Sequence, residues 1–172
     1  MKARAFAAVL ALLLGACAVA PPQPLPELVG VPVAFEVAGR LSLRQGQRSD
    51  IARLRWTHRG ASDLWVISSP FGNEVARIES SPGGATLVQA GGSPQQAGSF
   101  ADLTQQALGV ELDPAALAGW LHGRAPSQTS GWTVTLEETH KAGAVDVARR
   151  MSATRGEVTV RLVVDEYRVL GD

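Results

Sequence analysis

The segment DLWVISSPFGNEVARIE (Asp63–Glu79) contains two strand-like runs separated by a Pro-Phe-Gly turn. Proline suits the second position of such a turn and glycine its end, so Phe71 occupies the tip, where turns ordinarily carry Asn, Asp or Ser. The sequence therefore predicts a large apolar ring at the point of a hairpin. Two interpretations stay open: the ring folds back over the sheet as a cover for the core, or it stays in solvent for a function.

The hairpin lies within a longer series of strand patterns. Upstream, FEVAGRLSLR (35–44) and IARLRWTH (51–58) alternate apolar with polar residues, which indicates strands that are buried on one face. Further strands are predicted at 84–90, 95–98, 131–138, 147–153 and 157–167. About ten short strands that follow one another along the chain predict an antiparallel sheet, strongly curved or closed.

Two short helices interrupt the strands. Ser99, with Asp102 three residues later, forms a loose capping box for a helix that Gly109 ends. The Asp-Pro pair at 113–114 begins a second helix, which Gly123 ends. The apolar stripe of this second helix consists of Leu117, Trp120 and Leu121. Because the stripe has helical spacing, it should lie on the sheet.

A curved sheet around helices has either a filled core or an apolar hollow, and the sequence alone does not separate the two. The four tryptophans are Trp56, Trp65, Trp120 and Trp132. They are either ordinary core aromatics or part of such a hollow.

The N-terminus predicts export and a lipid anchor. Ten apolar residues, Ala5 to Leu14, follow two basic ones; this run is typical of a secretory signal and is too short to span a bilayer. The sequence LGAC (14–17) resembles a bacterial lipobox, so residues 1–16 would be a lipoprotein signal peptide and Cys17 would be lipidated. The alternative is an ordinary signal peptide with an unmodified cysteine.

The segment after the cysteine is a predicted tether. Residues 17–34 hold five prolines, which favour an extended, semi-rigid spacer. Ala18 stands where an aspartate would resemble the signal for inner-membrane retention, so the outer membrane is favoured. Residues 35–172 remain as one folded domain, long enough for a real core.

Composition and motifs argue against several function classes. The 16 basic and 16 acidic residues leave no basic excess for nucleic acid, and one cysteine allows no disulfide within the chain. His58, His122 and His140 are scattered next to turns, so solvent-exposed histidines are expected rather than metal ligands. The chain has no P-loop, dinucleotide fingerprint or Gly-x-Ser-x-Gly elbow. We therefore expect no enzyme, no cofactor and no metal site.

Seven segments, taken in order, carry a resemblance to a known family. They are FEVAGRLSLR, LRWTH, LWVISSPFGNEVARIE, ATLVQA, LGVELDPAALAGWLHGR, GWTVTLEE and RRMSATRGEVTVRLVVDEYRV. Together they are similar to the LolB family of outer-membrane lipoprotein receptors, from the lipobox to about Val169. The most specific pieces are the Gly39-Arg40 pair, the Pro70-Phe71-Gly72 turn and the helix that ends in Trp120-Leu121-x-Gly123.

The resemblance implies a fold and a site. The fold would be mainly β, with two or three short helices covering an incomplete, open antiparallel β-barrel of about eleven strands and an apolar cavity. Acyl chains would lie in that cavity, which we expect Trp56, Leu103, Leu117, Trp120, Leu121 and Trp132 to line. Phe71, flanked by Pro70 and Gly72, matches the apolar turn residue that the family needs to deliver cargo into the bilayer.

The resemblance also implies a function. A monomer held by lipidated Cys17 on the periplasmic face of the outer membrane would accept lipoproteins from the soluble carrier LolA and insert them into that membrane. Arg40, Arg53 and Arg55 would then be either solvated strand residues or part of a docking surface for an acidic carrier. The alternative function is a structural lipoprotein that scaffolds an envelope assembly, with the same anchor and a filled core.

The chain departs from the family at three places, one of which is the brief segment from Gly123 to Gly131. Family members commonly carry a helix between the anchor and the first strand, whereas here that interval is short and rich in proline. Tyr167 stands where the family often has tryptophan, a change that keeps an amphipathic aromatic residue.

Overall fold

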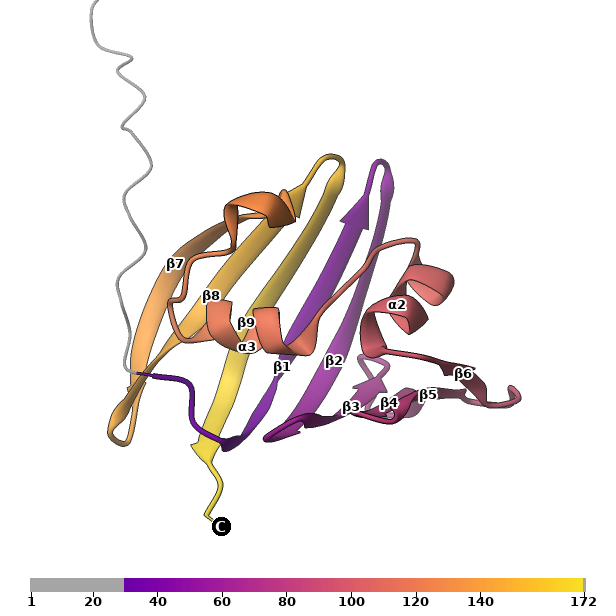
Figure 1. Cartoon of the computed structure of the whole chain (residues 1–172), viewed down its shortest axis with the longest axis horizontal. Helices are drawn as coiled ribbons and strands as arrows, with labels where there is room; N and C mark the ends of the chain where they lie inside the picture. The colour runs from indigo at the N-terminus through magenta and orange to yellow at the C-terminus, as the bar shows by residue number, and fades with distance from the viewer. Residues whose placement is uncertain (1–29, 172) are drawn as a thin grey trace, which may run out of the picture.

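One open antiparallel sheet of nine strands dominates residues 30–171, the part of the chain described by the computed structural model (Figure 1). The strands are β1 (Ala34–Gln45), β2 (Arg48–Arg59), β3 (Ser62–Ser68), β4 (Glu74–Ser81), β5 (Gly84–Gln89), β6 (Gln95–Ala97), β7 (Thr133–Ala142), β8 (Val145–Arg155) and β9 (Val158–Val169). Their order across the sheet is β6-β5-β4-β3-β2-β1-β9-β8-β7, so the first and last strands of the domain pair with each other inside the sheet, away from both edges. The predicted mainly β, open antiparallel fold is confirmed, with nine strands in place of the ten or so counted in the sequence and the eleven or so that the resemblance implies.

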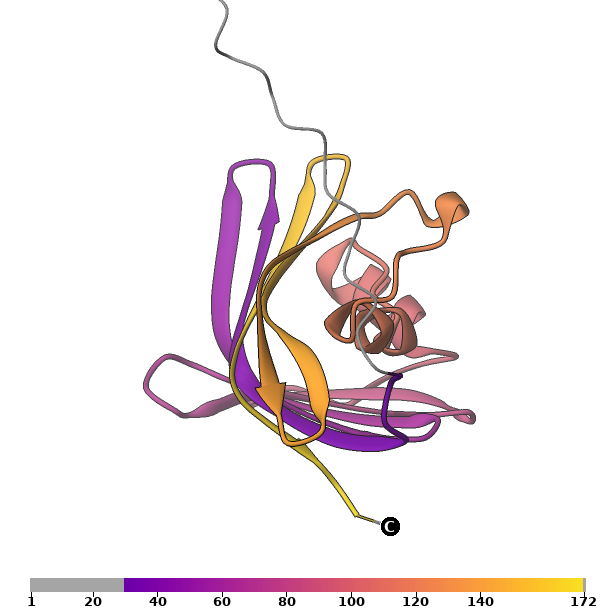
Figure 2. The same cartoon turned by 90° about the vertical axis from the view of Figure 1, so that its left-hand side faces the viewer.

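The sheet is bent, and its inner face holds the helices. Figure 2 shows the strands curving around α2 (Phe100–Leu108) and α3 (Pro114–Leu121), both on the concave side. A short 3-10 turn, Gln128–Ser130, precedes β7. The predicted helices are therefore confirmed, with α3 capped by His122 one residue before Gly123.

Local chemistry explains where the helices begin and end. The Ser99 hydroxyl oxygen accepts a hydrogen bond from the Asp102 amide at 3.1 Å, as a capping box requires. Gly109 then ends α2 in the left-handed conformation, with φ of 71°. The Asp113 carboxylate accepts from the Ala115 amide at 3.0 Å and so caps α3.

The bend of the central strands includes a bulge at Gly39. The pairing of β1 with β9 shifts register between Ala38 and Gly39, which leaves Asp165 as the extra residue. A Cβ atom on Gly39 would lie 2.1 Å from the Val163 carbonyl oxygen. Only glycine therefore allows β9 to approach β1 this closely.

Alternate strand residues separate the two faces. Apolar residues on the inner face, such as Phe35, Val37 and Trp56, are fully buried beneath the helices. Outer-face neighbours such as Arg40 and Arg53 are exposed. This alternation follows from the two-residue period of a strand.

Candidate functional site

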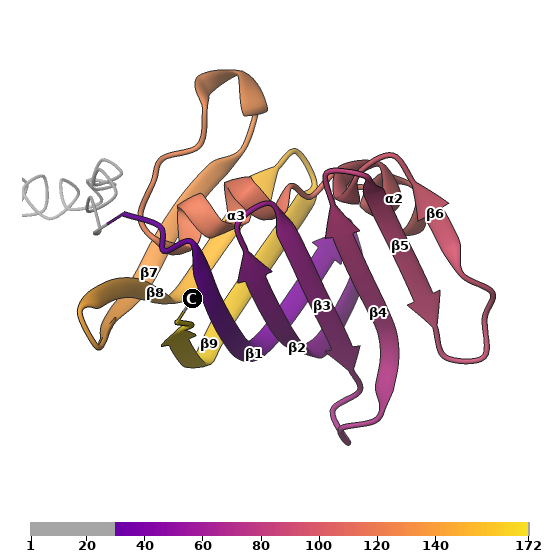
Figure 3. The ribbon, with the colours of Figure 1, turned by 60° about the horizontal axis from the view of Figure 1, so that its bottom comes forward.

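The β3–β4 loop carries the residue predicted to meet the membrane. The Gly72 amide donates to the Ser69 carbonyl at 2.9 Å, so Pro70 and Phe71 are the two central residues of the turn. Gly72 itself has a φ of 93°, in the region that favours glycine. The loop extends past the ends of its neighbours (Figure 3), and Phe71 is 94% exposed. In this structure the ring does not cover the core.

The six residues predicted for the acyl cavity come together on the inner face. Five are buried: Trp56 on β2, Leu103 on α2, and Leu117, Trp120 and Leu121 on α3. Trp132, just before β7, is half-buried and packs against the same apolar cluster. Its ring centroid lies 5.6 Å from that of Trp120. The structure thus joins strand, helix and loop residues into one apolar layer.

This layer is closely packed in the structure. Trp56 and Trp65 have ring centroids 5.5 Å apart, and Trp65 lies 4.9 Å from Phe100 of α2. Two hollows, of about 870 and 400 Å³, lie elsewhere in the described part of the chain and are lined by none of the six predicted cavity residues.

Two buried polar side chains, Asp63 and His58, form hydrogen bonds next to Trp56. The Trp56 indole N–H donates to the Asp63 carboxylate at 2.7 Å. The His58 Nδ1 atom lies 2.8 Å from the same oxygen, Oδ1. All three side chains are buried, so the carboxylate gives Trp56 and His58 a shared partner within the apolar layer.

A second buried histidine, His122, links α3 to the sheet by a hydrogen bond. His122 Nδ1 donates to the Ala118 carbonyl at 2.7 Å, which leaves Nε2 to accept from the Tyr167 hydroxyl on β9 at 2.8 Å. Burial lowers the pKa of His122, and the nearby His58 and Arg124 act in the same direction, while the Ala118 hydrogen bond opposes them. Burial also raises the pKa of Tyr167 to about 12. Both groups are thus neutral near pH 7.

The predicted exposure of the histidines is wrong for two of the three. His58 and His122 are buried, and each contacts the ring of Phe35, with centroids 4.9 and 5.3 Å apart. The prediction relied on the nearness of both residues to turns, whereas both side chains point to the inner face. The hairpin register, which places Asp63 directly opposite His58, is the sequence signal that would have found the first of them.

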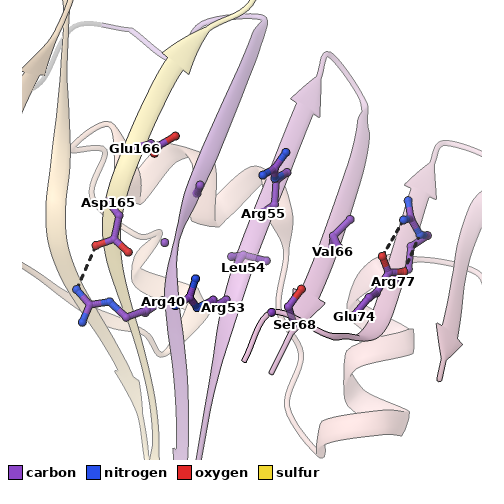
Figure 4. Close-up of a pocket in the computed structure, with 13 residues that line it drawn as sticks. Arg40, Arg53, Leu54, Arg55, Val66, Ser68, Glu74, Arg77, Asp165 and Glu166 are labelled. Carbon is purple, nitrogen blue, oxygen red and sulfur yellow. Dashed lines mark hydrogen bonds and ion pairs between the residues drawn. The ribbon is translucent and has the colours of Figure 1, made fainter. Parts of the chain in front are cut away.

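The larger hollow lies on the outer face, beside the β3–β4 loop. It has a volume of about 870 Å³. Figure 4 shows its side chains, which come from five neighbouring strands. Its charged residues are Arg40, Arg53, Arg55, Arg77, Glu74, Asp165 and Glu166. Three of these arginines, Arg40, Arg53 and Arg55, are docking candidates from the sequence, which does not predict a hollow.

Some of the sequence predictions concern residues that the structure does not describe. Cys17, the signal peptide and most of the tether precede residue 30 and are not described. Within residues 30–171, no three His, Cys, Asp or Glu side chains are grouped as metal ligands. In the same range, no helix has the length and apolar character needed to cross a membrane.

Comparisons with known proteins agree with the resemblance seen in the sequence. The profile of the family described as "Outer membrane lipoprotein LolB" matches residues 33–167. The chain is 32% identical to an outer-membrane lipoprotein LolB of Thiobacillus denitrificans, in an alignment that covers 98% of both chains. It is 34% identical to the protein of that name from Chromobacterium violaceum, covering 92% of this chain and 95% of the other. A solved LolA-superfamily protein from Nitrosomonas europaea aligns with a TM-score of 0.44 and 9% identity, over 81% of this chain and 87% of that one.

Proposed function

Because the chain belongs to the LolB family of outer-membrane lipoproteins, we propose that it receives lipoproteins from the periplasmic carrier LolA and inserts them into the outer membrane. It would act as a monomer, held on the periplasmic face by lipid on Cys17. Its contribution would be to bind the cargo's acyl chains and pass them on, without catalysis or a cofactor.

The observation that carries this proposal is the separation of two apolar features. The inner face supplies a large apolar layer under two short helices, while Phe71 stands 94% exposed at the tip of a loop outside it. An exposed phenylalanine between a proline and a glycine adds little to a stable core, but it could enter a bilayer. A protein that moves acyl chains into a bilayer needs both features.

Energetics explain why the cargo needs a receptor. Burial of each methylene stabilises by about 0.8 kcal/mol, so three acyl chains exposed to water would cost on the order of tens of kcal/mol. The chains must therefore pass directly from one apolar environment to the next. Relative affinity sets the direction, at about 1.4 kcal/mol for each tenfold difference, and no nucleotide is required.

Acyl chains would enter by displacing the helices. Within the described residues, one hydrogen bond joins α3 to the strands: the bond between its cap residue, His122, and Tyr167. Apolar packing accounts for the rest of the contact between α3 and the sheet. An incoming acyl chain can replace that packing with contacts of the same kind, because apolar contact is not directional. The sheet can stay fixed, since its backbone hydrogen bonds are independent of the helices.

Transfer of a labelled lipoprotein tests the proposal. The labelled cargo is bound to the carrier, mixed with this protein, and then offered liposomes. We expect the cargo to move to this protein first and to the liposomes second, with no added nucleotide. Cargo that stays with the carrier would contradict the proposal.

One observation favours the second candidate function, a structural scaffold. The six predicted cavity residues pack in a closed layer, as a filled core would. Binding of a fluorescent fatty acid by the unlipidated chain separates the two functions. Saturable binding that quenches the tryptophans is expected of the receptor, whereas a scaffold with a permanently filled core would show none.

A further inference from the structure

The hollow on the outer face contains two arginines without an acidic partner. Arg40 pairs with Asp165 at 3.1 Å, and Arg77 pairs with Glu74 at 2.9 Å. Arg53 and Arg55 have no ion pair within 4 Å among the described residues, and both are exposed. Two of the four guanidinium groups in this hollow are thus free to bind an external anion.

The register of the sheet concentrates this positive charge. Arg53 lies directly opposite Arg40 on the neighbouring strand; Asp165 neutralises Arg40, whereas the positive charge of Arg53 has no partner in the hollow. Arg53 and Arg55 are two residues apart on the same face of β2, so their Cα atoms are separated by about 7 Å. That spacing lets both planar side chains reach one tetrahedral anion, and guanidinium groups bind phosphate in a bidentate manner.

The hollow adjoins the loop that carries Phe71. Gly72, the next residue, lines the hollow, together with Ser68 at the end of β3. In Figure 2 the magenta β3–β4 loop extends beyond the outer face of β1 and β2, so the hollow and the loop tip lie on the same side of the molecule. A surface that the tip of the loop entered would therefore face the hollow.

We propose that this hollow binds the phosphodiester of a phospholipid headgroup, through Arg53 and Arg55, while Phe71 enters the adjoining acyl region. This inference rests on the proposed function and extends it, because it assigns the membrane contact to two parts, one ionic and one apolar. The three carboxylates in the hollow limit the net attraction. The site therefore recognises the phosphate itself and not merely a highly charged surface.

Vesicle binding tests the headgroup site. The protein is the mature chain, residues 17–172, with Cys17→Ala, so that only the folded domain holds it to lipid. Vesicles of phosphatidylcholine with phosphatidylglycerol are compared with vesicles of a phosphate-free galactolipid. We expect Arg53→Gln with Arg55→Gln to weaken binding to the phospholipid vesicles by about tenfold, and to leave binding to the galactolipid vesicles unchanged.

A matched control removes the same charge elsewhere. Arg44→Gln with Arg59→Gln changes two exposed arginines that do not line the hollow. It should weaken phospholipid binding much less than the Arg53 and Arg55 pair. Equal losses in the two double variants would overturn the proposal, because net charge alone would then account for the effect. An unchanged affinity in the Arg53 and Arg55 variant would overturn it too.

Two further outcomes keep this inference separate from the proposed function. If the Arg53 and Arg55 variant binds vesicles normally but fails to take cargo from the carrier, the hollow docks the carrier and the headgroup site is wrong. If native protein fails to move cargo at all, the proposed function is wrong, whatever the vesicles show. Folding of each variant is checked by its thermal unfolding curve.

Discussion

At the residue scale, Phe71 combines high exposure with a rigid setting. The ring is 94% exposed, and the turn beneath it is fixed by the Gly72 to Ser69 hydrogen bond of 2.9 Å. A side chain with few contacts to the rest of the protein adds little to stability. Its identity should therefore matter to lipid contact and not to folding.

Phe71→Glu should leave the domain stable and able to accept cargo, but should block release of cargo into lipid. A charge at the tip adds a desolvation cost of several kcal/mol, where an apolar side chain gains about 1.5–3 kcal/mol on entering the acyl boundary. Phe71→Leu is the matched control and should work nearly as well as the native protein. The measurement is transfer from carrier to receptor and then from receptor to liposomes, with thermal unfolding alongside. Normal release by Phe71→Glu would mean that the turn has no role in delivery.

Gly39 shows the opposite case, a residue whose importance is entirely structural. Gly39→Ala would place a Cβ atom 2.1 Å from the Val163 carbonyl oxygen, so β1 and β9 must separate locally. We expect a loss of about 1–3 kcal/mol in the free energy of unfolding, measured in urea. Gly30→Ala is the control, because a Cβ there meets nothing within 4 Å. A Gly39→Ala protein as stable as the control would show that the bulge tolerates a side chain.

At the element scale, α2 and α3 were predictable because their signals are local. The signal for the start of each helix lies within a few neighbouring residues: Ser99 with Asp102 for α2, and the Asp-Pro pair at 113–114 for α3. The burial of His122 depends instead on Tyr167, 45 residues away, and on how α3 lies across β9. Sequence periodicity places a residue on a face of its own helix or strand, but it does not say what a distant strand brings opposite that face.

The hydrogen bond between α3 and β9 gives a prediction about helix movement. Tyr167→Phe removes the donor to His122 Nε2 and leaves that buried nitrogen without a partner, which should cost about 1–3 kcal/mol of stability. If α3 must lift for an acyl chain to enter, the same change should speed uptake of a fluorescent fatty acid. Stopped-flow fluorescence measures that rate. A less stable protein with unchanged uptake would show that α3 stays in place during binding.

The buried His122 also predicts a dependence of stability on pH. Its pKa is lowered in the folded protein, mainly by burial, so the unfolded chain binds the proton more tightly. The contribution of neutral His122 is then fully present above the unfolded pKa of about 6.5, and is lost as the pH falls from there through the folded pKa. Urea unfolding between pH 7.5 and 5 should show a steeper loss for the native protein than for His122→Gln. Nuclear magnetic resonance titration of the His122 ring checks the same point directly, and a pKa at or above 6.5 would contradict it.

At the scale of the whole molecule, the two faces of the sheet carry different features. The inner face carries the apolar layer, and the outer face carries the arginine hollow and the loop. Alternation along 35–44 and 51–58 predicted which residues lie on each face. The hollow itself was not predictable, because it arises from the bend that brings five strands and the loop around one space.

Lipid on Cys17 would set how often the loop meets a membrane. Cys17 precedes the described residues, whose buried core positions begin at Ala34 and Phe35, and we expect the anchor to add nothing to that core. Cys17→Ala should therefore keep the native unfolding curve and the ability to accept cargo, while the protein leaves the membrane fraction. Delivery to liposomes should become slower and should recover as lipid is added, because the tether acts by raising the effective concentration of membrane near Phe71. Fractionation of cells and transfer rates at several lipid concentrations measure both effects. If the Cys17→Ala protein still sediments with membranes at high salt, where ionic contacts are screened, apolar contact such as that of Phe71 holds it, and the lipoprotein anchor is not what retains it.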